Sequence, residues 1–298
     1  MPYGIGIDLG GTNIKIVAVS EAGEVLDRST CETEANSPVS WVETIRHRIK
    51  EIEETRESAR WIGLAAPGLA ARDSLSIASM PGKLRGLEGL AWTEALQTSH
   101  PVPVLNDAHA ALLGEAWVGA ARGYRDAVLL TLGTGVGGAI LADGRLYKGH
   151  IGRAGHLGHI SLNPDGRPDI VGTPGSLELT IGNSTLPERS GGQFTSTREL
   201  VAAHLSGDPK ASEIWLRSVY DLAAGITSIV NALDPEVIII GGGIAQAGSA
   251  LFEPLAGFMT SIEWRPQGHR VQIIPAALGD IAGTLGAVYY AMNWSAEN

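Results

Sequence analysis

The sequence predicts an α/β protein made of two related lobes, each built on a mixed β-sheet. Short buried strands alternate with amphipathic helices along 298 residues, and one strand–glycine turn–strand–hairpin unit occurs twice. The length exceeds what a single core usually serves, which agrees with two domains. We expect residues 1–118 with 281–298 in an N-terminal lobe and residues 119–280 in a C-terminal lobe, facing each other across a cleft.

The first half of the chain opens with the repeated unit and then alternates helix and strand. Strands are expected at residues 3–8, 14–19, 24–29, 61–65 and 102–105. A helix is expected over 39–54, where Val42, Ile45, Ile49 and Ile52 recur at helical spacing. A second helix over 108–118 follows Asp107, a residue type favoured in a first helical turn.

The second half repeats the opening unit before it turns helical. The segment Thr131-Leu-Gly-Thr-Gly corresponds to Asp8-Leu-Gly-Gly-Thr in the first unit. The hairpin turn of the second unit is expected at Asp143-Gly144. Strands are expected at residues 127–132, 136–141, 237–240 and 271–274. Helices are expected at residues 197–205, 211–233, 246–261 and 281–292. We interpret the similarity of the two strand–turn–strand units as an internal duplication. The units are too far apart in the sequence to be the short repeats of a solenoid protein.

Composition and charge exclude several classes of protein. Lys and Arg number 22 and Asp and Glu number 32, so the formal charge of −10 disfavours nucleic-acid binding and anionic membranes. A single cysteine, Cys31, excludes an internal disulfide and a cysteine-based zinc cage. No run of about 18 apolar residues and no signal sequence is visible, so a cytoplasmic protein is expected.

Three expected strands end in glycine turns, at residues 8–12, 132–138 and 241–244. In the first, Gly10 and Gly11 let backbone N–H groups point at an anion, Thr12 adds a hydroxyl, and Lys15 offers a cation. Asp8 at the strand end suits Mg²⁺, held directly or through water. The alternative for Asp8 is a carboxylate that caps the turn.

Asp107 is the second carboxylate, after Asp8, that is a candidate for a role in catalysis. It follows a strand, precedes a helix and sits beside Asn106, an arrangement that aims a side chain into a cleft. A carboxylate there can take the proton from a hydroxyl that attacks phosphorus. The alternative is simple capping of the helix, for which Asn and Asp are both well suited.

Six motifs in order resemble the ROK family, which comprises repressors, open-reading-frame proteins and sugar kinases. They are Asp8-Leu-Gly-Gly-Thr-Asn-Ile-Lys15, Leu105-Asn-Asp-Ala108, Gly133-Thr-Gly-Val-Gly-Gly138, Gly155-His-Leu-Gly-His159, Gly175-Ser-Leu-Glu178 and Gly241-Gly-Gly-Ile244. The resemblance covers essentially the whole chain. It implies the two-domain actin/hexokinase-like (ribonuclease H-like) fold, with ATP, Mg²⁺ and a sugar as ligands.

The resemblance also implies roles for individual residues. Asp107 would be the general base, and Asp8 would hold Mg²⁺ with ATP. The ATP-binding set is Asp8, Gly10, Gly11, Thr12, Lys15, Gly133, Thr134, Gly135, Gly137, Gly138, Gly241, Gly242, Gly243 and Ile244. The sugar-binding set is Gly68, Ser79, Asn106, Asp107, His156, His159 and Glu178. Family members usually form homodimers, and the helix-turn-helix module of the family's repressors is not expected here.

The family's structural zinc site is not expected either. Family kinases hold zinc with one histidine and three cysteines. Here His159 matches the histidine, but the cysteine positions fall on Asp169, Val171 and Ser176. Valine cannot bind zinc and serine is a poor ligand. The loop must then be held by packing and hydrogen bonds, with prolines limiting its freedom.

Two further departures concern the sugar pocket. The family's sugar-binding glutamate falls at His156, and its asparagine falls at Ser79. An imidazole offers one donor and one acceptor where a carboxylate accepts twice. His156 and His159 are interpreted as pocket-lining residues. One alternative is a metal site that they form with His150 and Asp169, and the other is a purely structural role.

The predicted function is ATP-dependent phosphorylation of a sugar hydroxyl, with a preferred substrate that is not glucose. Other hexoses, amino sugars and cyclitols are the candidate substrates. The alternatives are a non-catalytic sugar sensor of the same fold, and a phosphotransferase that acts on a carboxylate or uses polyphosphate.

Overall fold

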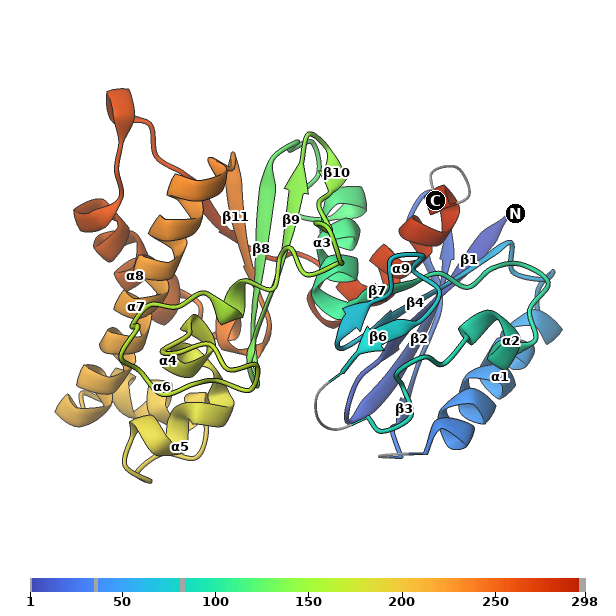
Figure 1. Ribbon diagram of the computed structural model, residues 1–298, viewed down its shortest axis with the longest axis horizontal. Helices are drawn as coiled ribbons and strands as arrows, with labels where there is room; N and C mark the ends of the chain where they lie inside the picture. Colours follow the sequence, from blue (N-terminus) through green and yellow to red (C-terminus); the bar gives the residue numbers. More distant parts are fainter. Residues whose placement is uncertain (1, 35–36, 81–83, 295–298) are drawn as a thin grey trace. The chain divides into compact units, whose positions relative to one another are not determined.

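The computed structural model describes residues 2–34, 37–80 and 84–294. The chain divides into two compact units (Figure 1). Unit 1 comprises Met1–Gly123, Leu146–Ala154 and Ala277–Asn298, and unit 2 comprises Tyr124–Arg145 and Gly155–Ala276. The C-terminal segment therefore returns to the unit in which the chain began.

Unit 1 is built on a five-stranded mixed sheet in the order β3-β2-β1-β4-β7. Its strands are β1 (Tyr3–Leu9), β2 (Asn13–Ser20), β3 (Val25–Glu32), β4 (Trp61–Ala66) and β7 (Val104–Asn106). β2 is antiparallel to both β1 and β3, while β1, β4 and β7 are parallel. A small antiparallel pair, β5 (Leu69–Ala70) and β6 (Ile77–Ser79), was not expected from sequence.

Helices cover both faces of this sheet, because side chains of β2 alternate between two cores. Ile14 and Ile16 pack in the core that includes apolar residues of α1 (Pro38–Glu54) and α2 (Trp92–Leu96). Val17 and Val19 pack on the opposite face with Leu285 and Val288 of α9 (Ala282–Asn293). The last helix of the chain is thus an integral part of unit 1.

Glycines let α9 approach the strands and α3 (Asp107–Val118) at backbone distance. A Cβ at Gly6 of β1 or Gly63 of β4 would lie 2.0 Å from a carbonyl oxygen of α9. A Cβ at Gly286 of α9 would lie 1.6 Å from the Ala110 carbonyl oxygen of α3. Real Cβ atoms do not reach such distances, so the packing of α9 on β1, β4 and α3 depends on glycine.

Unit 2 repeats the same sheet, in the order β10-β9-β8-β11-β12. Its strands are β8 (Ala127–Leu132), β9 (Val136–Ala142), β10 (Arg145–Leu146), β11 (Val237–Gly241) and β12 (Gln272–Pro275). β9 is antiparallel to β8, whereas β11 is parallel to both β8 and β12. The strand order matches that of unit 1, and so do the directions of β8, β9, β11 and β12, which supports the predicted duplication.

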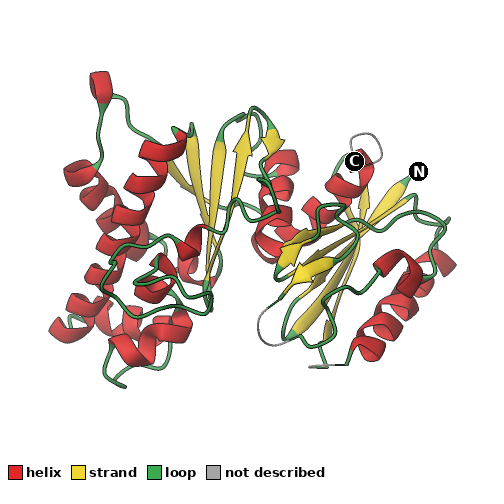
Figure 2. Cartoon of the chain, viewed as in Figure 1, coloured by secondary structure: helices red, strands yellow, loops and turns green. Residues whose placement is uncertain are grey.

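The helices of unit 2 gather on one side of its sheet (Figure 2). They are α4 (Leu177–Ile181), α5 (Leu186–Arg189), α6 (Thr197–Leu205), α7 (Pro209–Leu233) and α8 (Ser249–Ile262). The described residues also form the 3₁₀ turns η1 (Leu157–His159), η2 (Asn183–Thr185), η3 (Gly243–Ala247), η4 (Pro266–Gly268) and η5 (Gly279–Ile281). No helix in the described part of the chain is long and apolar enough to cross a membrane.

Other stretches also differ from the sequence expectations. The helix expected over 246–261 begins at Ser249, because Gly248 takes a positive φ of 57° after the η3 turn. Residues 119–123 and 277–280, expected in the C-terminal lobe, belong to unit 1 instead, and so do residues 146–154. There the Ala154 carbonyl lies 2.8 Å from Nε2 of buried His109, and Lys148 Nζ donates to Ser74 and Tyr290.

Replacing Gly286 by alanine should destabilise the protein by several kcal/mol, because the added methyl group meets the α3 backbone. The matched control is Gly257→Ala in α8, where a Cβ meets nothing within 4 Å. There the better helix propensity of alanine should stabilise by up to about 1 kcal/mol. Urea unfolding measures both free energies, and equal effects would contradict the proposed close packing.

Candidate functional site

Asp8 and Asp107 lie at the same edge of the unit 1 sheet. Asp8 pairs with Ala65 of β4, and Ala65 pairs with Leu105 of β7, two residues before Asp107. Because these strands are parallel, their carboxyl ends meet at one edge. Asn106 caps α3 by accepting from the N–H of Ala108 at 3.0 Å, which fixes Asp107 as the first residue of the helix.

Both carboxyl groups are held in surroundings that disfavour their charge. Burial, reinforced by the negative charge of Asp107 and opposed by Lys15, raises the pKa of Asp8 from 3.8 to about 6. Burial also raises the pKa of Asp107, although the Ala108 N–H donates to its Oδ1 at 2.8 Å. Asp107 is still exposed to solvent. The pKa of Asp107 is therefore raised because surrounding protein atoms displace part of the water around the carboxyl group, although the side chain is not fully enclosed.

The first glycine turn joins β1 to β2 beside this pair. The Gly10 N–H donates to the Asn13 carbonyl at 2.9 Å, and a Cβ at Gly11 would meet nothing within 4 Å. Gly11 and Thr12 are exposed. The turn thus offers an open backbone surface that can receive a ligand.

Lys15 faces the same region, because it is the residue of β2 that pairs with Asp8. Its Nζ donates to the Asp280 carbonyl at 3.0 Å and lies 3.7 Å from the Asp280 carboxylate. Arg28 shares that carboxylate at 2.6 Å. The predicted ATP-binding lysine is therefore held by a partner that the sequence did not indicate.

Three residues predicted for the sugar site lie beside Asp107. The side-chain amide of Asn106 donates to the Gly68 carbonyl at 3.0 Å. Gly68 has φ of 98°, and a Cβ there would lie 2.6 Å from the Ser79 carbonyl oxygen. Ser79 itself is exposed. The structure thus brings Gly68, Ser79, Asn106 and Asp107 together within unit 1.

In unit 2, the turn between β8 and β9 is hydrogen-bonded to the side chain of Glu178. The N–H of Val136 donates to Oε2 of Glu178 at 2.9 Å, and a Cβ at Gly135 would lie 2.2 Å from that oxygen. Gly138 is equally confined, because a Cβ there would lie 2.6 Å from the Gly155 carbonyl oxygen. Glu178, predicted as a sugar ligand, thus also fixes the shape of the second glycine turn.

A cavity of about 540 Å³ in unit 2 brings the second and third glycine turns together. It is lined by Gly133, Thr134, Asn183, Ser196, Thr197, Arg198, Val201, Gly243, Ile244, Gln246 and Ala247. Gly242 makes the third turn possible, because it has φ of 86° and a Cβ there would lie 2.3 Å from the Leu132 carbonyl oxygen. The volume is that of a small-molecule site.

Several lining residues of this cavity were missed in the sequence. One signal was available, since Ser196-Thr-Arg-Glu199 has the capping-box pattern that begins α6. The Ser196 hydroxyl accepts from the Glu199 N–H at 3.3 Å. Asn183 had no local signal; its Oδ1 accepts from the Thr197 N–H at 2.7 Å, a contact that only folding creates.

His159 is held by a buried carboxylate. Its Nδ1 lies 2.8 Å from Oδ2 of Asp169, whose side chain has no exposed surface. The N–H groups of Val171 and Thr173 donate to the other oxygen at 3.0 and 2.9 Å. Burial opposes the charge of Asp169, but these hydrogen bonds, led by that of His159, hold its pKa below the ordinary value. The loop is thus organised around Asp169.

This arrangement determines which nitrogen of His159 carries a proton. With Asp169 ionised, Nδ1 donates, so the neutral ring keeps Nε2 as an acceptor. His156 precedes the same η1 turn, whereas His150 belongs to unit 1. Among the residues described, no group of three or more His, Cys, Asp or Glu side chains is placed to hold a metal ion.

The predicted site residues are divided between the units. Those of unit 1 are Asp8, Gly10, Gly11, Thr12, Lys15, Gly68, Ser79, Asn106 and Asp107. Those of unit 2 are Gly133, Thr134, Gly135, Gly137, Gly138, His156, His159, Glu178, Gly241, Gly242, Gly243 and Ile244.

Comparison with known proteins extends over nearly the whole chain. A family profile described as "ROK family" matches residues 4–293. The chain is 32% identical to the glucokinase of Thermotoga maritima, with 95% of each chain covered. It is 30% identical to the N-acetylmannosamine kinase of Vibrio cholerae, with 96% of this chain and 98% of that one covered.

A solved structure agrees with these matches. The ROK family glucokinase of Streptomyces griseus, in complex with glucose and AMPPNP, has a TM-score of 0.80 and 27% identity. The comparison covers 98% of this chain and 99% of that one. The fold expected from the six motifs, with its mixed sheets, is therefore confirmed.

In metal-free buffer, replacement of Asp8 by asparagine should stabilise the protein at pH 7.5. The folded-state pKa of about 6 lies above the ordinary 3.8, so folding favours the protonated carboxyl, and this contribution to stability is lost as pH rises through 6. The variant should gain up to about 3 kcal/mol at pH 7.5 and little at pH 4. Urea unfolding in EDTA measures this, and lower stability at pH 7.5 would refute the electrostatic account.

Proposed function

Because this chain belongs to the ROK family and is an ATP-dependent carbohydrate kinase, we propose that Asp107 is the general base that activates the sugar hydroxyl. The observation that carries the proposal is the position of Asp107 at the start of α3, exposed to solvent and close enough to Asp8 to raise its pKa. Asp107 keeps a surface that can face a ligand.

Asp107 accepts the proton of the attacking hydroxyl as the bond from that oxygen to phosphorus forms and the bond to the leaving ADP oxygen breaks. The raised pKa of Asp107 makes it a stronger base than an ordinary aspartate, which favours this transfer. The cap made by Asn106 and the hydrogen bond from Ala108 hold the carboxylate in one orientation.

The first glycine turn and Asp8 are proposed to serve Mg·ATP. Bound Mg·ATP supplies the transferred phosphoryl group and a cation that offsets its charge. Mg²⁺ in kinases typically takes one or two carboxylates together with phosphates and water, so Asp8 beside Asp107 fits this need. The exposed N–H groups of Gly11 and Thr12 would bind phosphate oxygens, with Lys15 adding positive charge.

The cavity of unit 2 is proposed to hold the nucleotide. Its walls combine backbone of the β8–β9 turn, the buried side chain of Ile244 and hydroxyls at the start of α6. A flat apolar base can pack on Ile244, while Ser196 and Thr197 offer polar contacts. Gly135, Gly137, Gly138, Gly241 and Gly242 would shape the two turns so that their backbone can approach phosphate.

The sugar-binding residues are proposed to be Gly68, Ser79, Asn106, His156, His159 and Glu178. His159 would accept from a sugar hydroxyl through Nε2, because Asp169 engages Nδ1. Oε2 of Glu178 is engaged by Val136, so Oε1 is the oxygen that can accept from a ligand. Homodimer formation and a cytoplasmic location are further expectations of the family resemblance.

We propose that glucose is not the preferred sugar. His156 and Ser79 present different hydrogen-bonding groups from those of the family pattern, while the residues assigned to phosphate are kept. A polar mismatch in a buried pocket strongly changes which hydroxyl pattern is accepted. The relatives above include both glucokinases and an N-acetylmannosamine kinase, so the family accommodates such changes.

Replacement of Asp107 by alanine or asparagine should lower kcat by about 10²- to 10⁴-fold, because the proton acceptor is lost. Circular dichroism and thermal melting should show an intact fold. Glu94→Gln, which changes an exposed carboxylate of α2 in the same unit, is the control and should keep full activity. ADP release in the presence of sugar measures turnover, and near-wild-type kcat in both Asp107 variants would exclude the base assignment.

A panel of hexoses, amino sugars and cyclitols, tested with ATP, should give the highest kcat/KM for a substrate other than glucose. The double variant His156→Glu with Ser79→Asn should improve the ratio for glucose by about tenfold or more. If wild-type protein already prefers glucose by a wide margin, the substrate proposal fails. If no sugar is phosphorylated while one stabilises the protein, a sugar sensor is the better description.

A further inference from the structure

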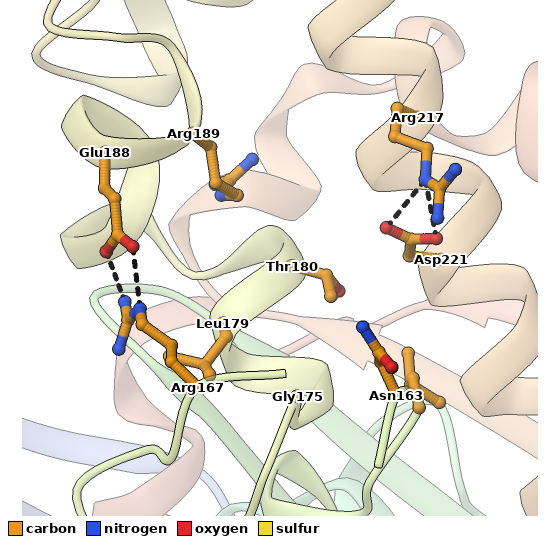
Figure 3. Close-up of a pocket in the computed structure, with 10 residues that line it drawn as sticks. Asn163, Arg167, Gly175, Leu179, Thr180, Glu188, Arg189, Arg217 and Asp221 are labelled. Atoms are coloured by element: carbon orange, nitrogen blue, oxygen red, sulfur yellow. Dashed lines mark hydrogen bonds and ion pairs between the residues drawn. The ribbon is translucent and has the colours of Figure 1, made fainter. Parts of the chain in front are cut away.

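A second cavity in unit 2, of about 290 Å³, is lined by charged side chains that the kinase reaction does not use (Figure 3). The charged and hydroxyl-bearing residues that matter here are Arg167, Thr180, Glu188, Arg189, Arg217 and Asp221. They come from the loop before α4 and from helices α4, α5 and α7. None of them lines the larger cavity assigned to the nucleotide.

Two of the three arginines are paired with carboxylates. Arg167 binds Glu188 with Nε at 2.8 Å from Oε1 and Nη2 at 2.5 Å from Oε2. Arg217 binds Asp221 with Nε 3.1 Å from Oδ2. Figure 3 shows these ion pairs as dashed lines, with the Arg189 side chain lying between them in the view and no dashed line reaching it. Three cations and two anions leave the cavity with one excess positive charge.

Arg189 has only neutral hydrogen-bond acceptors among the residues described. Its Nε donates to the Thr185 hydroxyl at 3.2 Å, Nη1 to the Ser218 hydroxyl at 2.6 Å and Nη2 to the Gly182 carbonyl at 2.9 Å. Burial, opposed by Asp221, lowers the pKa of Arg189 to about 10. A guanidinium carries five N–H donors, so two remain after these three bonds.

We infer that this cavity is a binding site for a small phosphate-bearing anion, with Arg189 as its principal ligand. A partly buried cation that makes no direct ion pair is costly, and an oxyanion that accepts the remaining N–H donors relieves that cost. The planar guanidinium suits phosphate geometry, and the Thr180 hydroxyl and the arginine pairs line the rest of the volume. The volume matches a phosphate group with a small substituent rather than a nucleotide.

The site is joined to the turn that lines the larger cavity. The Gly182 carbonyl accepts from Arg189, and the next two residues, Asn183 and Ser184, donate their N–H groups to the carbonyls of Gly133 and Thr134 at 2.9 Å each. An anion that shifts Arg189 thus acts on a segment that is hydrogen-bonded to the β8–β9 turn. Binding at this site and nucleotide affinity should therefore be coupled, and the coupling must be reciprocal.

The test is thermal melting and calorimetric titration of the full-length protein with inorganic phosphate, or glucose 6-phosphate as a phosphate ester, against sodium chloride at equal ionic strength. Each titration is run without and with a saturating non-hydrolysable ATP analogue, which occupies the nucleotide site. Wild-type protein should show a saturable rise in Tm of about 2 °C or more. Arg189→Gln should weaken binding at least about tenfold, while Arg270→Gln, an exposed arginine outside the cavity, should not.

Thr180→Ile gives a second route if the Arg189 variant does not fold, because it fills the cavity and leaves the guanidinium in place. Loss of phosphate binding in this variant supports the inference. Equal phosphate binding in wild type and either cavity variant overturns it. So does a phosphate effect that chloride reproduces, or one that disappears when the ATP analogue is bound. The two phosphate arms distinguish free phosphate from an ester as ligand, and the readout does not depend on kinase activity.

Discussion

The backbone-to-backbone packing of α9 against the unit 1 sheet and α3 is the constraint on which the aspartate pair depends. Gly6 and Gly63 admit the α9 carbonyls on the sheet side, and Gly286 admits the Ala110 carbonyl on the α3 side. Buried Glu115 strengthens the joint, because it accepts from the N–H groups of Ala277 and Leu278. α3 and β1 are thereby fixed to one helix, and Asp107 and Asp8 come to share one edge of the sheet.

The chain treats its buried charges in two ways, and the difference separates structure from function. Asp169 and Glu115 each accept hydrogen bonds from backbone N–H groups, so their charge is stabilised and they hold the fold together. Asp8 has a pKa raised by burial and by a neighbouring carboxylate, and Arg189 is partly buried with only neutral hydrogen-bond acceptors among the described residues. Such unfavourable environments are retained where a ligand can compensate them.

Duplication supplied two equivalent sheets but not two equivalent sites. Asp8 of β1 corresponds to Thr131 of β8, so the repeated strand carries a hydroxyl where the first carries a carboxylate. In unit 2, the larger cavity is instead lined by this glycine turn together with residues of α6 and of the η2 and η3 turns. The same backbone order therefore serves a carboxylate-based site in one unit and a pocket for a small molecule in the other.

The sequence by itself determined the repeated strand–turn–strand units, the helical stripe of α1 and the position of Asp107 after a strand, because periodicity and capping act over a few residues. The capping interpretation of that segment is confirmed, because Asn106 caps the helix, whereas the role of Asp107 as a base stays a proposal. Only the tertiary structure decided that Asp169 would orient His159, that Asn183 would join the larger cavity and that Arg189 would donate its hydrogen bonds to neutral groups. These depend on contacts between residues distant along the chain, which no local pattern encodes.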